Sequence, residues 1–237
     1  ARAIRSIVRE KRLKAAVNFQ LRFSPKMLAA ADAINRGMIG ELLEIDVEVN
    51  IFTPWHMFPF LEGADRVELS LHSIHYLDMI RALAGNPASV FCRSMSDPRS
   101  PTVTQTRTSA ILDYGGTLRV LMNINHNHSD QKFQHATFRI EGMEGEMMIK
   151  MGVLYDYPQG EPDELWIRRK DSDWRSIPLN GTWFPDAFVG KMSNVLRCDG
   201  GEDEVLVSEV EDAFGTMALV EACFDANDLK GVVPAQA

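Results

Sequence analysis

The sequence predicts an α+β fold, in which a large, open and mostly antiparallel sheet carries helices on one face. Residues 88–180 contain short runs of alternating apolar and polar residues between turn residues, which is typical of antiparallel strands. Helical periodicity precedes this region, at residues 25–36 and 67–84, and follows it after residue 208. Strands that are grouped together, with helices before and after them, favour this class over an alternating α/β fold.

The composition is that of a folded globular protein, with 237 residues of which 45% are hydrophobic and 24% are charged. The 25 basic and 33 acidic side chains give a net charge of -8, which argues against a nucleic-acid partner. No apolar run approaches the roughly 18 residues of a membrane span, and residues 1–14 are charged where a signal peptide is apolar. We therefore expect a cytoplasmic protein without a membrane partner. The 3 cysteines include no CxxC pair, so no disulfide framework or cysteine zinc site is predicted.

The N-terminal region predicts a helix, a strand and a second helix. Residues 1–14 are compatible with a short basic helix, and the alternation of apolar and polar residues over Ala15–Phe23 predicts a strand. Ser24 offers a capping hydroxyl and Pro25 suits the first helical position, so we expect a helix to begin there and to end at Gly37.

Two long elements follow. Residues 43–51 alternate strictly, which predicts a strand with one buried face and one acidic face in solvent. Residues 67–84 predict a helix that ends at Gly85, because Pro87 prevents continuation. Its apolar residues surround the cylinder, so we expect this helix to be buried on more than one side.

Seven further strands are predicted, joined mostly as hairpins. Gly115-Gly116 and Met143-Glu144 mark two of the turns. The strands lie at residues 88–95, 108–114, 117–126, 136–142, 145–151, 164–169 and 174–179.

The chain closes with two predicted helices. The first is marked by the apolar residues Phe188, Met192 and Val195. The second begins at Ser208, where Glu211 completes a capping box, and it ends at Lys230 and Gly231.

The strongest candidate for chemistry is a group of three polar residues on the apolar helix over residues 67–84. Helical geometry places His75 about 60° from both His72 and Asp78 around the axis, so the three lie on neighbouring parts of one side. Burial without partners would cost a few kcal/mol each, so they either satisfy one another or face a polar cavity. Imidazole suits proton transfer near neutral pH. The alternative is a pair of hydrogen-bonded core histidines.

A second histidine cluster follows the strand that ends near residue 126. His126 and His128 alternate onto one side, with His135 nearby, which is compatible with half of a metal site. Because no cysteine pair supplies further ligands, we expect a solvated strand end or a subunit contact, and we predict no metal site.

Two other places offer substrate contacts. Arg22, in a row with Asn18, has the charge to clamp an anionic or polyhydroxyl ligand, although a strand arginine also forms structural ion pairs. Trp55 and His56, in an aromatic loop, are suited to lining a sugar-sized pocket, and core or oligomer contacts are the alternatives. The sequence has no GxGxxG, no GxxxxGK[ST] and no GxSxG motif.

The order of several segments resembles the C-terminal region of the Gfo/Idh/MocA family, named for glucose-fructose oxidoreductase and inositol dehydrogenase. The resemblance runs over residues 15–233. Its segments are NFQLRFSP, INRGMIGELLEIDVEV, HSIHYLDMIRALAGNPASV, FRIEGMEGEMMI and SEVEDAFGTMALVEACFDANDLKGVV.

This resemblance implies a domain division. Residues 1–22 resemble the tail of a Rossmann-type domain, and residues 23–237 resemble the domain that binds substrate and forms oligomers, whose fold is like the C-terminal domains of dihydrodipicolinate reductase and glyceraldehyde-phosphate dehydrogenase. In the family, NAD or NADP is bound by the preceding domain, so no cofactor-binding residue is assigned in this chain. The resemblance also implies a homodimer or homotetramer formed through the sheet face.

The family's signature helix reads Asp-x-x-x-His-x-x-Asp. His75 and Asp78 match its later positions, whereas Leu71 stands in place of the aspartate. The resemblance implies that His75 acts as general base on a hydroxyl or carbonyl of a sugar, sugar derivative or cyclitol, with His72 as a different donor and Asp78 in the substrate site. The alternatives are a non-catalytic sugar-binding or dimerisation protein, and a metal-dependent enzyme that uses His126, His128 and the helix histidines.

Overall fold

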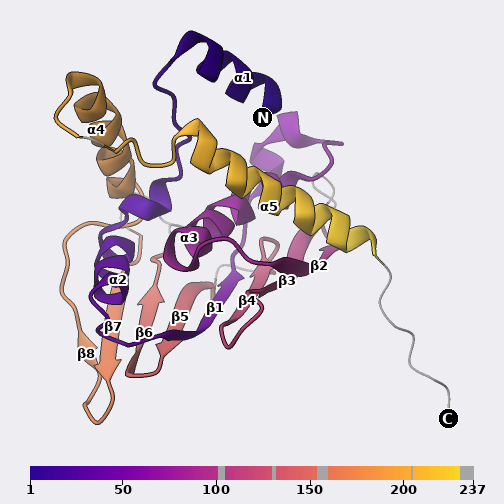
Figure 1. The fold of residues 1–237 in the computed structure, drawn as a ribbon. Helices are drawn as coiled ribbons and strands as arrows, with labels where there is room; N and C mark the ends of the chain where they lie inside the picture. The colour runs from indigo at the N-terminus through magenta and orange to yellow at the C-terminus, as the bar shows by residue number, and fades with distance from the viewer. Residues whose placement is uncertain (101–104, 130–131, 154–159, 204, 230–237) are drawn as a thin grey trace.

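The computed structural model describes residues 1–100, 105–129, 132–153, 160–203 and 205–229. One sheet of eight strands runs through the molecule in the order β2-β3-β4-β1-β5-β6-β7-β8 (Figure 1). The strands are β1 (Leu42–Asn50), β2 (Ser89–Ser96), β3 (Gln105–Asp113), β4 (Arg119–Asn125), β5 (His135–Gly142), β6 (Gly145–Lys150), β7 (Glu164–Arg169) and β8 (Arg175–Ser176).

The central strand β1 gives the sheet its one parallel pairing between these strands. It runs parallel to β4 and antiparallel to β5, so that Val47 lies between Met122 and Phe138. All other neighbouring strands pair antiparallel. The predicted α+β class, with a mostly antiparallel open sheet, is confirmed.

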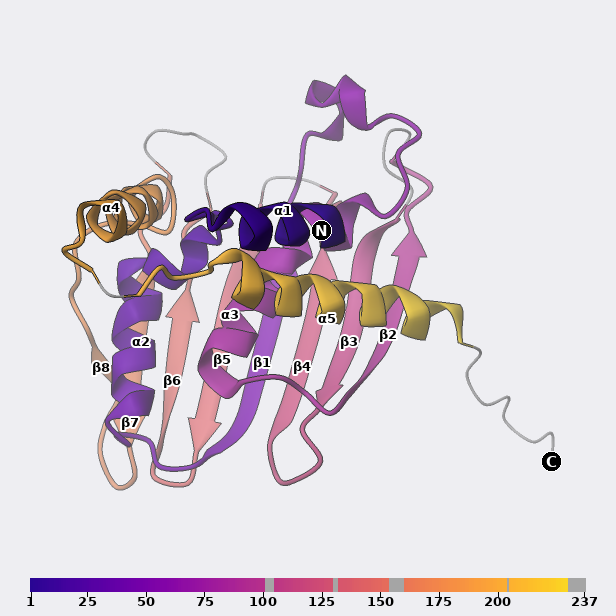
Figure 2. The same cartoon turned by 45° about the horizontal axis from the view of Figure 1, so that its top comes forward.

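The helices lie on one face of the sheet (Figures 1 and 2). The helix α5 contacts β2 and α3, and α2 contacts β6 and β7. Among the described helices, none has both the length and the apolar character that a bilayer crossing needs. The helices are α1 (Arg2–Lys11), α2 (Pro25–Asn35), α3 (Ile74–Ala84), α4 (Asp186–Gly200) and α5 (Val210–Asp228), with short turns η1 (Gln20–Phe23), η2 (Trp55–Met57), η3 (Pro59–Leu61) and η4 (Leu69–Ser73).

The hydrophobic core lies between the sheet and this helical layer. Ile45 and Val47 point into it from β1, and Leu77 and Ile80 from α3, all four with no exposed surface. The sequence alternation of β1 therefore produces its buried face as predicted. On the other face, however, Glu44 is buried because Arg119 and Arg139 both pair with its carboxylate, so the acidic face is not fully solvated.

The strand expected over Ala15–Phe23 is wrong. Ala16 makes only an isolated bridge to Glu209, and residues 20–23 form the 3-10 helix η1. Among the described residues no strand lies beside this segment, whose backbone bonds instead to Ser208 and Val210. The segment then turns inward, so that the consecutive residues Gln20 and Leu21 are both buried. The alternation of apolar and polar residues over Ala15–Phe23 therefore does not mark a strand.

The expected helix boundaries are correct to within a few residues, but two caps differ. Ser24 holds the N-cap position of α2 without a capping side-chain hydrogen bond. The helix α5 begins at Val210 after Glu209, and the Ser208 hydroxyl has no partner among the described residues. No capping box forms, because Glu211 pairs with Arg9 of α1. The expected end of this helix at Lys230 and Gly231 lies outside the described residues.

Candidate active site

A cavity of about 710 Å³ lies between the helix formed by η4 and α3, the aromatic loop after β1 and the start of α4. The loop, which contains η2 and η3, rises beyond the end of the sheet (Figure 2). Among the described residues, the lining contains no lysine, arginine or carboxylate and is mostly apolar and aromatic. Its polar side chains are Gln20, Thr53, His56, His72, His75, Tyr76, His126 and Gln134.

His72 and His75 reach the cavity from consecutive turns of one helix. Residues 69–73 form a π-helical segment that continues into α3 at Ile74. A π-helical turn contains more residues than an α-helical turn, which changes the residue that faces a given side. Both histidines line the cavity, whereas the Leu71 side chain is 43% exposed and lies outside the lining. Thus His72, and not Leu71, joins His75 in the cavity.

A further histidine of the cavity, His126, is buried and directly follows β4. Its ring centroid lies 4.4 Å from that of His72, and the Trp55 indole donates a hydrogen bond of 3.1 Å to its carbonyl oxygen. The predicted clusters on the helix and at the strand end therefore meet in one place. His128 does not join them, because its Nε2 lies 2.9 Å from the Lys132 carbonyl oxygen.

Glu68 is a buried carboxyl behind these rings that the sequence prediction missed. Ser73 and Thr108 donate hydrogen bonds to its two oxygens, and Oε1 lies 3.8 Å from His126 Nε2. Burial raises the pKa of Glu68 to about 7, and the hydrogen bonds from Ser73 and Thr108 oppose that rise. Its place four residues before His72 was the available signal, because this spacing puts two side chains on one helical side.

His72, His75 and His126 are held neutral. Burial is the main cause that lowers the pKa of His72 to about 4, and the neighbouring His75 lowers it further. Burial also lowers the pKa of His75, against the opposing effect of Asp78, and lowers that of His126 well below its ordinary value. The atoms His72 Nδ1, His75 Nδ1 and His126 Nε2 are buried without a hydrogen-bond partner among the described residues. The Nδ1 atoms of His72 and His75 are available to a ligand hydroxyl in the cavity, whereas His126 Nε2 faces the buried Glu68.

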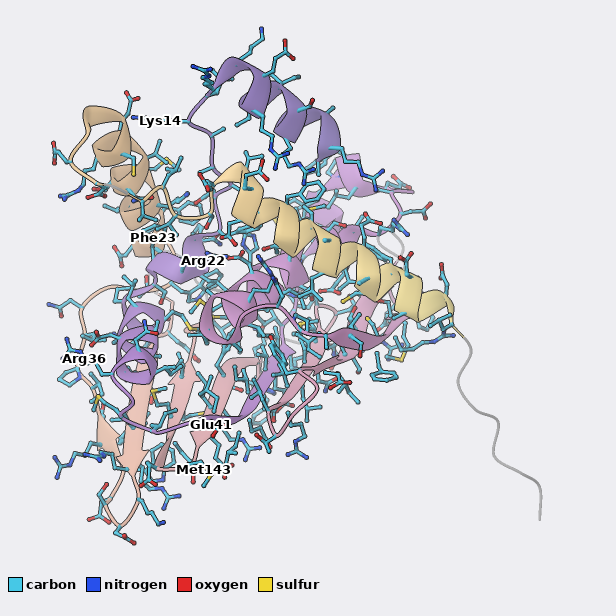
Figure 3. The ribbon with its side chains drawn as sticks, viewed as in Figure 1. Lys14, Arg22, Phe23, Arg36, Glu41 and Met143 are labelled. Carbon is cyan, nitrogen blue, oxygen red and sulfur yellow. The ribbon has the colours of Figure 1, made fainter. Side chains whose placement is uncertain are left out.

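Arg22 and Asp78 face each other and do not line the cavity. Arg22 donates two hydrogen bonds to Asp78, of 2.6 and 2.7 Å, and its Nη1 lies 2.7 Å from Asp212 of α5. Figure 3 shows Arg22 where η1 meets the helical layer. This geometry is that of the structural ion pair that the sequence left open for Arg22.

The other predicted substrate contacts take different positions. His56 lines the cavity and is exposed, whereas Trp55 is buried beneath it with its ring centroid 5.2 Å from that of His72. Asn18 lies outside the lining, and its Oδ1 is buried without a hydrogen-bond partner among the described residues. Within the described part of the chain, no three metal-ligating side chains gather in a group.

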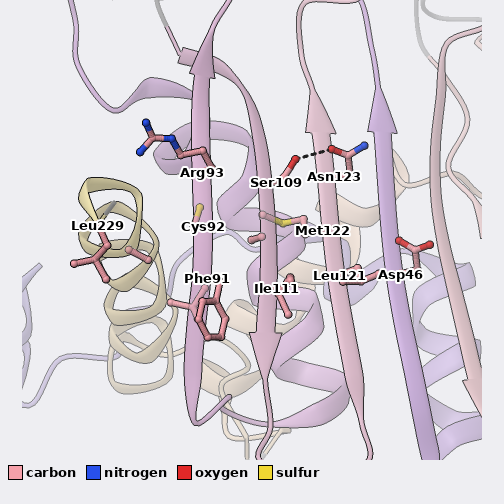
Figure 4. A pocket seen from close by; sticks show the side chains of 13 residues that line it. Asp46, Phe91, Cys92, Arg93, Ser109, Ile111, Leu121, Met122, Asn123 and Leu229 are labelled. Carbon is pink, nitrogen blue, oxygen red and sulfur yellow. Dashed lines mark hydrogen bonds between the residues drawn. The ribbon is translucent and has the colours of Figure 1, made fainter. Parts of the chain in front are cut away.

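A second hollow, of about 860 Å³, lies at the β2–β3–β4 side of the sheet (Figure 4). Phe91 and Ile111 are 63% and 47% exposed there. Unlike the first cavity, it offers no histidine, and its Asp46 is only partly buried. The histidine cavity is therefore the candidate active site.

Comparison with known proteins gives one family and many related folds. A family model described as the GFO/IDH/MocA C-terminal domain matches residues 27–148. No curated protein sequence matches the chain.

Three of the similar solved structures illustrate the fold. An oxidoreductase from Agrobacterium radiobacter in complex with NAD+, L-tartaric acid and magnesium has a TM-score of 0.77 at 17% identity, over 95% of this chain and 66% of that one. Levoglucosan dehydrogenase in complex with NADH and levoglucosan has a TM-score of 0.76 at 16% identity, over 95% and 67%. Aldose-aldose oxidoreductase from Caulobacter crescentus, complexed with glycerol, has a TM-score of 0.76 at 13% identity, over 95% and 65%.

These identities show a shared fold, and the chain spans about two thirds of the length of each structure. The family match is independent of them and covers more than half of the 237 residues. It agrees with the resemblance carried by the order of the sequence segments. The chain therefore belongs to the GFO/IDH/MocA C-terminal domain family.

Proposed function

We propose that this chain is the substrate-binding and catalytic part of an NAD- or NADP-dependent oxidoreductase that acts on a hydroxyl or carbonyl of a sugar, sugar derivative or cyclitol. The observation that carries the proposal is the buried, neutral and unpartnered Nδ1 of His75 in the cavity. A family of oxidoreductases, with relatives that bind levoglucosan or glycerol, supports the same class of substrate.

The lining favours an uncharged polyol. The described lining residues carry no cation to pair with a phosphate or carboxylate, whereas aromatic faces suit the C–H surfaces of a sugar ring. The unpartnered imidazole nitrogens of His72 and His75 then bind hydroxyl groups. Arg22 and Asp78 are assigned to holding α3 in place, because they are hydrogen-bonded to each other.

The described residues also fit one side of a nicotinamide reaction, since an apolar cavity with unpartnered imidazoles excludes water and holds a hydroxyl. When bound, the cofactor supplies the hydride acceptor or donor. We assign its binding mainly to a nucleotide-binding domain of which residues 1–22 form the tail, with residues 23–237 as the substrate domain. His75 then accepts the hydroxyl proton in oxidation and returns it in reduction, and His72 offers a second hydrogen bond.

The full-length product of the gene tests this proposal. We expect it to bind NAD or NADP in equilibrium dialysis and to oxidise at least one sugar or cyclitol, and we expect His75→Ala to lower kcat about 100-fold or more. His128→Ala is the matched control, because His128 lies outside the cavity lining and should leave kcat unchanged. A protein that binds no dinucleotide would instead be a non-catalytic sugar-binding or dimerisation protein, and unchanged turnover in His75→Ala would remove His75 from the reaction.

Two further properties belong to this proposal. The sheet face that carries no helices exposes Phe91 and Ile111, which supports a homodimer or homotetramer built through that face. We also place this enzyme in the cytoplasm, where nicotinamide-dependent reactions of small soluble metabolites take place.

A further inference from the structure

A hydroxyl, an imidazole and a carboxyl follow one another from the cavity into the core. Thr53 lines the cavity, and its Oγ1 lies 3.4 Å from His126 Nδ1. On the other side of the same ring, His126 Nε2 lies 3.8 Å from Glu68 Oε1. The His126 ring therefore lies between Thr53, which lines the cavity, and Glu68, which lies in the core.

The carboxyl end is buried and has no compensating cation. Glu68 is 1% exposed, and none of the described lysines or arginines forms an ion pair with it. Hydroxyl groups stabilise its oxygens instead: Thr108 donates a hydrogen bond of 2.6 Å to Oε2, and Ser73 donates to Oε1. The other ionisable groups that interact with Glu68 or with the His126 ring are His72, Tyr76, Cys92 and Cys223.

We propose that Thr53, His126 and Glu68 form a proton relay that carries a proton between the cavity and a buried store on Glu68. This proposal rests on the proposed function, in which a hydroxyl bound in the cavity must lose a proton. Glu68 then supplies, from four residues before His72, the carboxyl that the signature helix lacks at Leu71. Glu68 acts through His126 and is a positioning residue, whereas Thr53 contacts the substrate.

The transfer balances with one proton moved. The proton that His75 has taken from the substrate hydroxyl bonds to Thr53 Oγ1, while the proton that Thr53 itself carried passes to His126 Nδ1. The Nε2–H bond of His126 breaks at the same time, and that proton bonds to Glu68 Oε1. The threonine hydroxyl is restored, the imidazole ends neutral as the other tautomer, and the carboxylate becomes a carboxylic acid. The substrate oxygen keeps the electron pair of its O–H bond and forms the carbonyl as hydride leaves carbon in the reaction proposed above.

The environment of each group suits its part. Burial lowers the pKa of His126 well below its ordinary value, so the ring passes a proton on and does not keep a charge. Burial raises the pKa of Glu68 to about 7, so the carboxyl can both take and release a proton near neutral pH. The lowered pKa of His75 makes a lasting imidazolium unfavourable, so a proton taken by His75 needs a further acceptor.

The relay makes a prediction that needs neither cofactor nor substrate. A small movement of the Glu68 side chain would close the 3.8 Å gap to His126 Nε2. At a pH below the titration midpoint of Glu68, the protonated carboxyl then donates to Nε2, which requires the Nδ1–H tautomer. Above that midpoint, the carboxylate accepts from Nε2–H. We therefore expect nitrogen NMR of the histidine-labelled chain to show His126 changing tautomer, without becoming charged, with a midpoint near pH 7. Tautomer ratios that are constant from pH 5 to 9, or conversion of His126 to the imidazolium, would overturn the proposal.

Variants show whether the relay groups cause the change. Glu68→Gln should abolish the pH-dependent tautomer change, Thr53→Val should move its midpoint, and Thr53→Ser should restore it. Glu44→Gln is the matched control, because Glu44 is also a buried carboxylate but pairs with Arg119 and Arg139 on the other face of the sheet. Persistence of the change in Glu68→Gln contradicts the relay.

A second measurement uses the unmodified chain in case Glu68→Gln does not fold. Infrared difference spectra of glutamate-labelled protein should show a protonated carboxyl that is lost between pH 6 and 8, and its absence would equally overturn the relay. Failure of these measurements leaves the proposed oxidoreductase activity standing. A full-length protein without dinucleotide binding, but with the tautomer change, would instead remove the proposed function alone.

Discussion

Asp78 accepts hydrogen bonds from Arg22 of η1 and from Thr216 of α5, the latter of 2.7 Å. Its side chain has no exposed surface, whereas that of Arg22 is 14% exposed. One buried carboxylate therefore joins three segments and fixes the helix that presents His75 to the cavity. Removing it leaves the half-buried Arg22 with Asp212 as its one acidic partner within the described part of the chain.

Asp78→Ala should lower the free energy of unfolding by about 3 kcal/mol, because Arg22 loses the more buried of its two carboxylate partners and the buried Thr216 hydroxyl loses its acceptor. Asp32→Ala is the control: Asp32 pairs with Arg36, but the two side chains are 57% and 71% exposed. An exposed pair of this kind contributes about 0.5 kcal/mol or less. Urea denaturation of both variants makes the comparison, and equal losses of stability would contradict the structural role of Asp78.

The residues of the site differ in how far the sequence could reveal them. His72 and His75 could be paired from helical spacing alone, because the angle per residue fixes which side chains share a side. His126 could not be joined to them, since its contact with His72 depends on how the end of β4 meets the helix. The position of the Leu71 side chain outside the cavity depends on a π-helical segment, which no periodicity of the sequence indicated.

The β5–β6 hairpin has no space for a side chain at the point where it meets β7. Gly142 pairs with Gly145 at its end, and the next strand, β7, passes close to the second glycine. A Cβ on Gly145 would lie 2.3 Å from the Arg168 carbonyl oxygen and 3.1 Å from Arg169 Cα. Backbone atoms cannot move away as a side-chain tip can, so the β6–β7 pairing requires a residue without a side chain.

Gly145→Ala should therefore destabilise the protein by about 1–3 kcal/mol, the usual range for overpacking. Gly116→Ala, in the β3–β4 turn, is the matched control, because a Cβ there has no atom within 4 Å and the backbone is not left-handed. It should be neutral or stabilising by up to about 1 kcal/mol. Thermal unfolding of the two variants decides the matter, and a harmless Gly145→Ala would mean that the strands separate easily.

At the scale of elements, strands with a neighbour on each side were predictable and the segment before α2 was not. Strict alternation along β1 reflects a real difference between two faces of a sheet. The same pattern over Ala15–Phe23 arises in a chain that bridges only at Ala16 and then turns as η1. Alternation in the sequence does not show whether a neighbouring strand is present to pair with the segment. Tertiary contacts therefore decide whether an alternating segment becomes a strand.

The whole molecule is asymmetric, with helices on one face of the sheet and open strands on the other (Figure 2). The open face carries the exposed apolar side chains Phe91 and Ile111. It also carries the ion pairs of Glu44 with Arg119 and Arg139. An apolar area with satisfied charges beside it is the kind of surface that a second copy of the chain would cover.

Ile111→Arg should reduce the mass in sedimentation equilibrium from that of a dimer or tetramer towards that of a monomer, because an unpaired charge would be buried between the copies. Leu28→Arg is the control, since Leu28 on α2 is exposed to a similar extent, 49% against 47% for Ile111. A monomeric parent chain, or equal effects of the two variants, would show that the open face is not the interface.

The place of β1 has a consequence for the order in which the protein forms. The strands β2–β4 and β5–β8 are two groups in which each strand pairs with its neighbour in sequence, and β1 lies between the groups. Its pairings reach far along the chain, as from Glu44 to Arg119 and Glu141. Local hairpins close at a smaller entropic cost than such distant pairings. β1 precedes the other seven strands in this sequence, yet we expect it to pair last, after β2–β4 and β5–β8 have each formed, because both of its neighbours lie far along the chain.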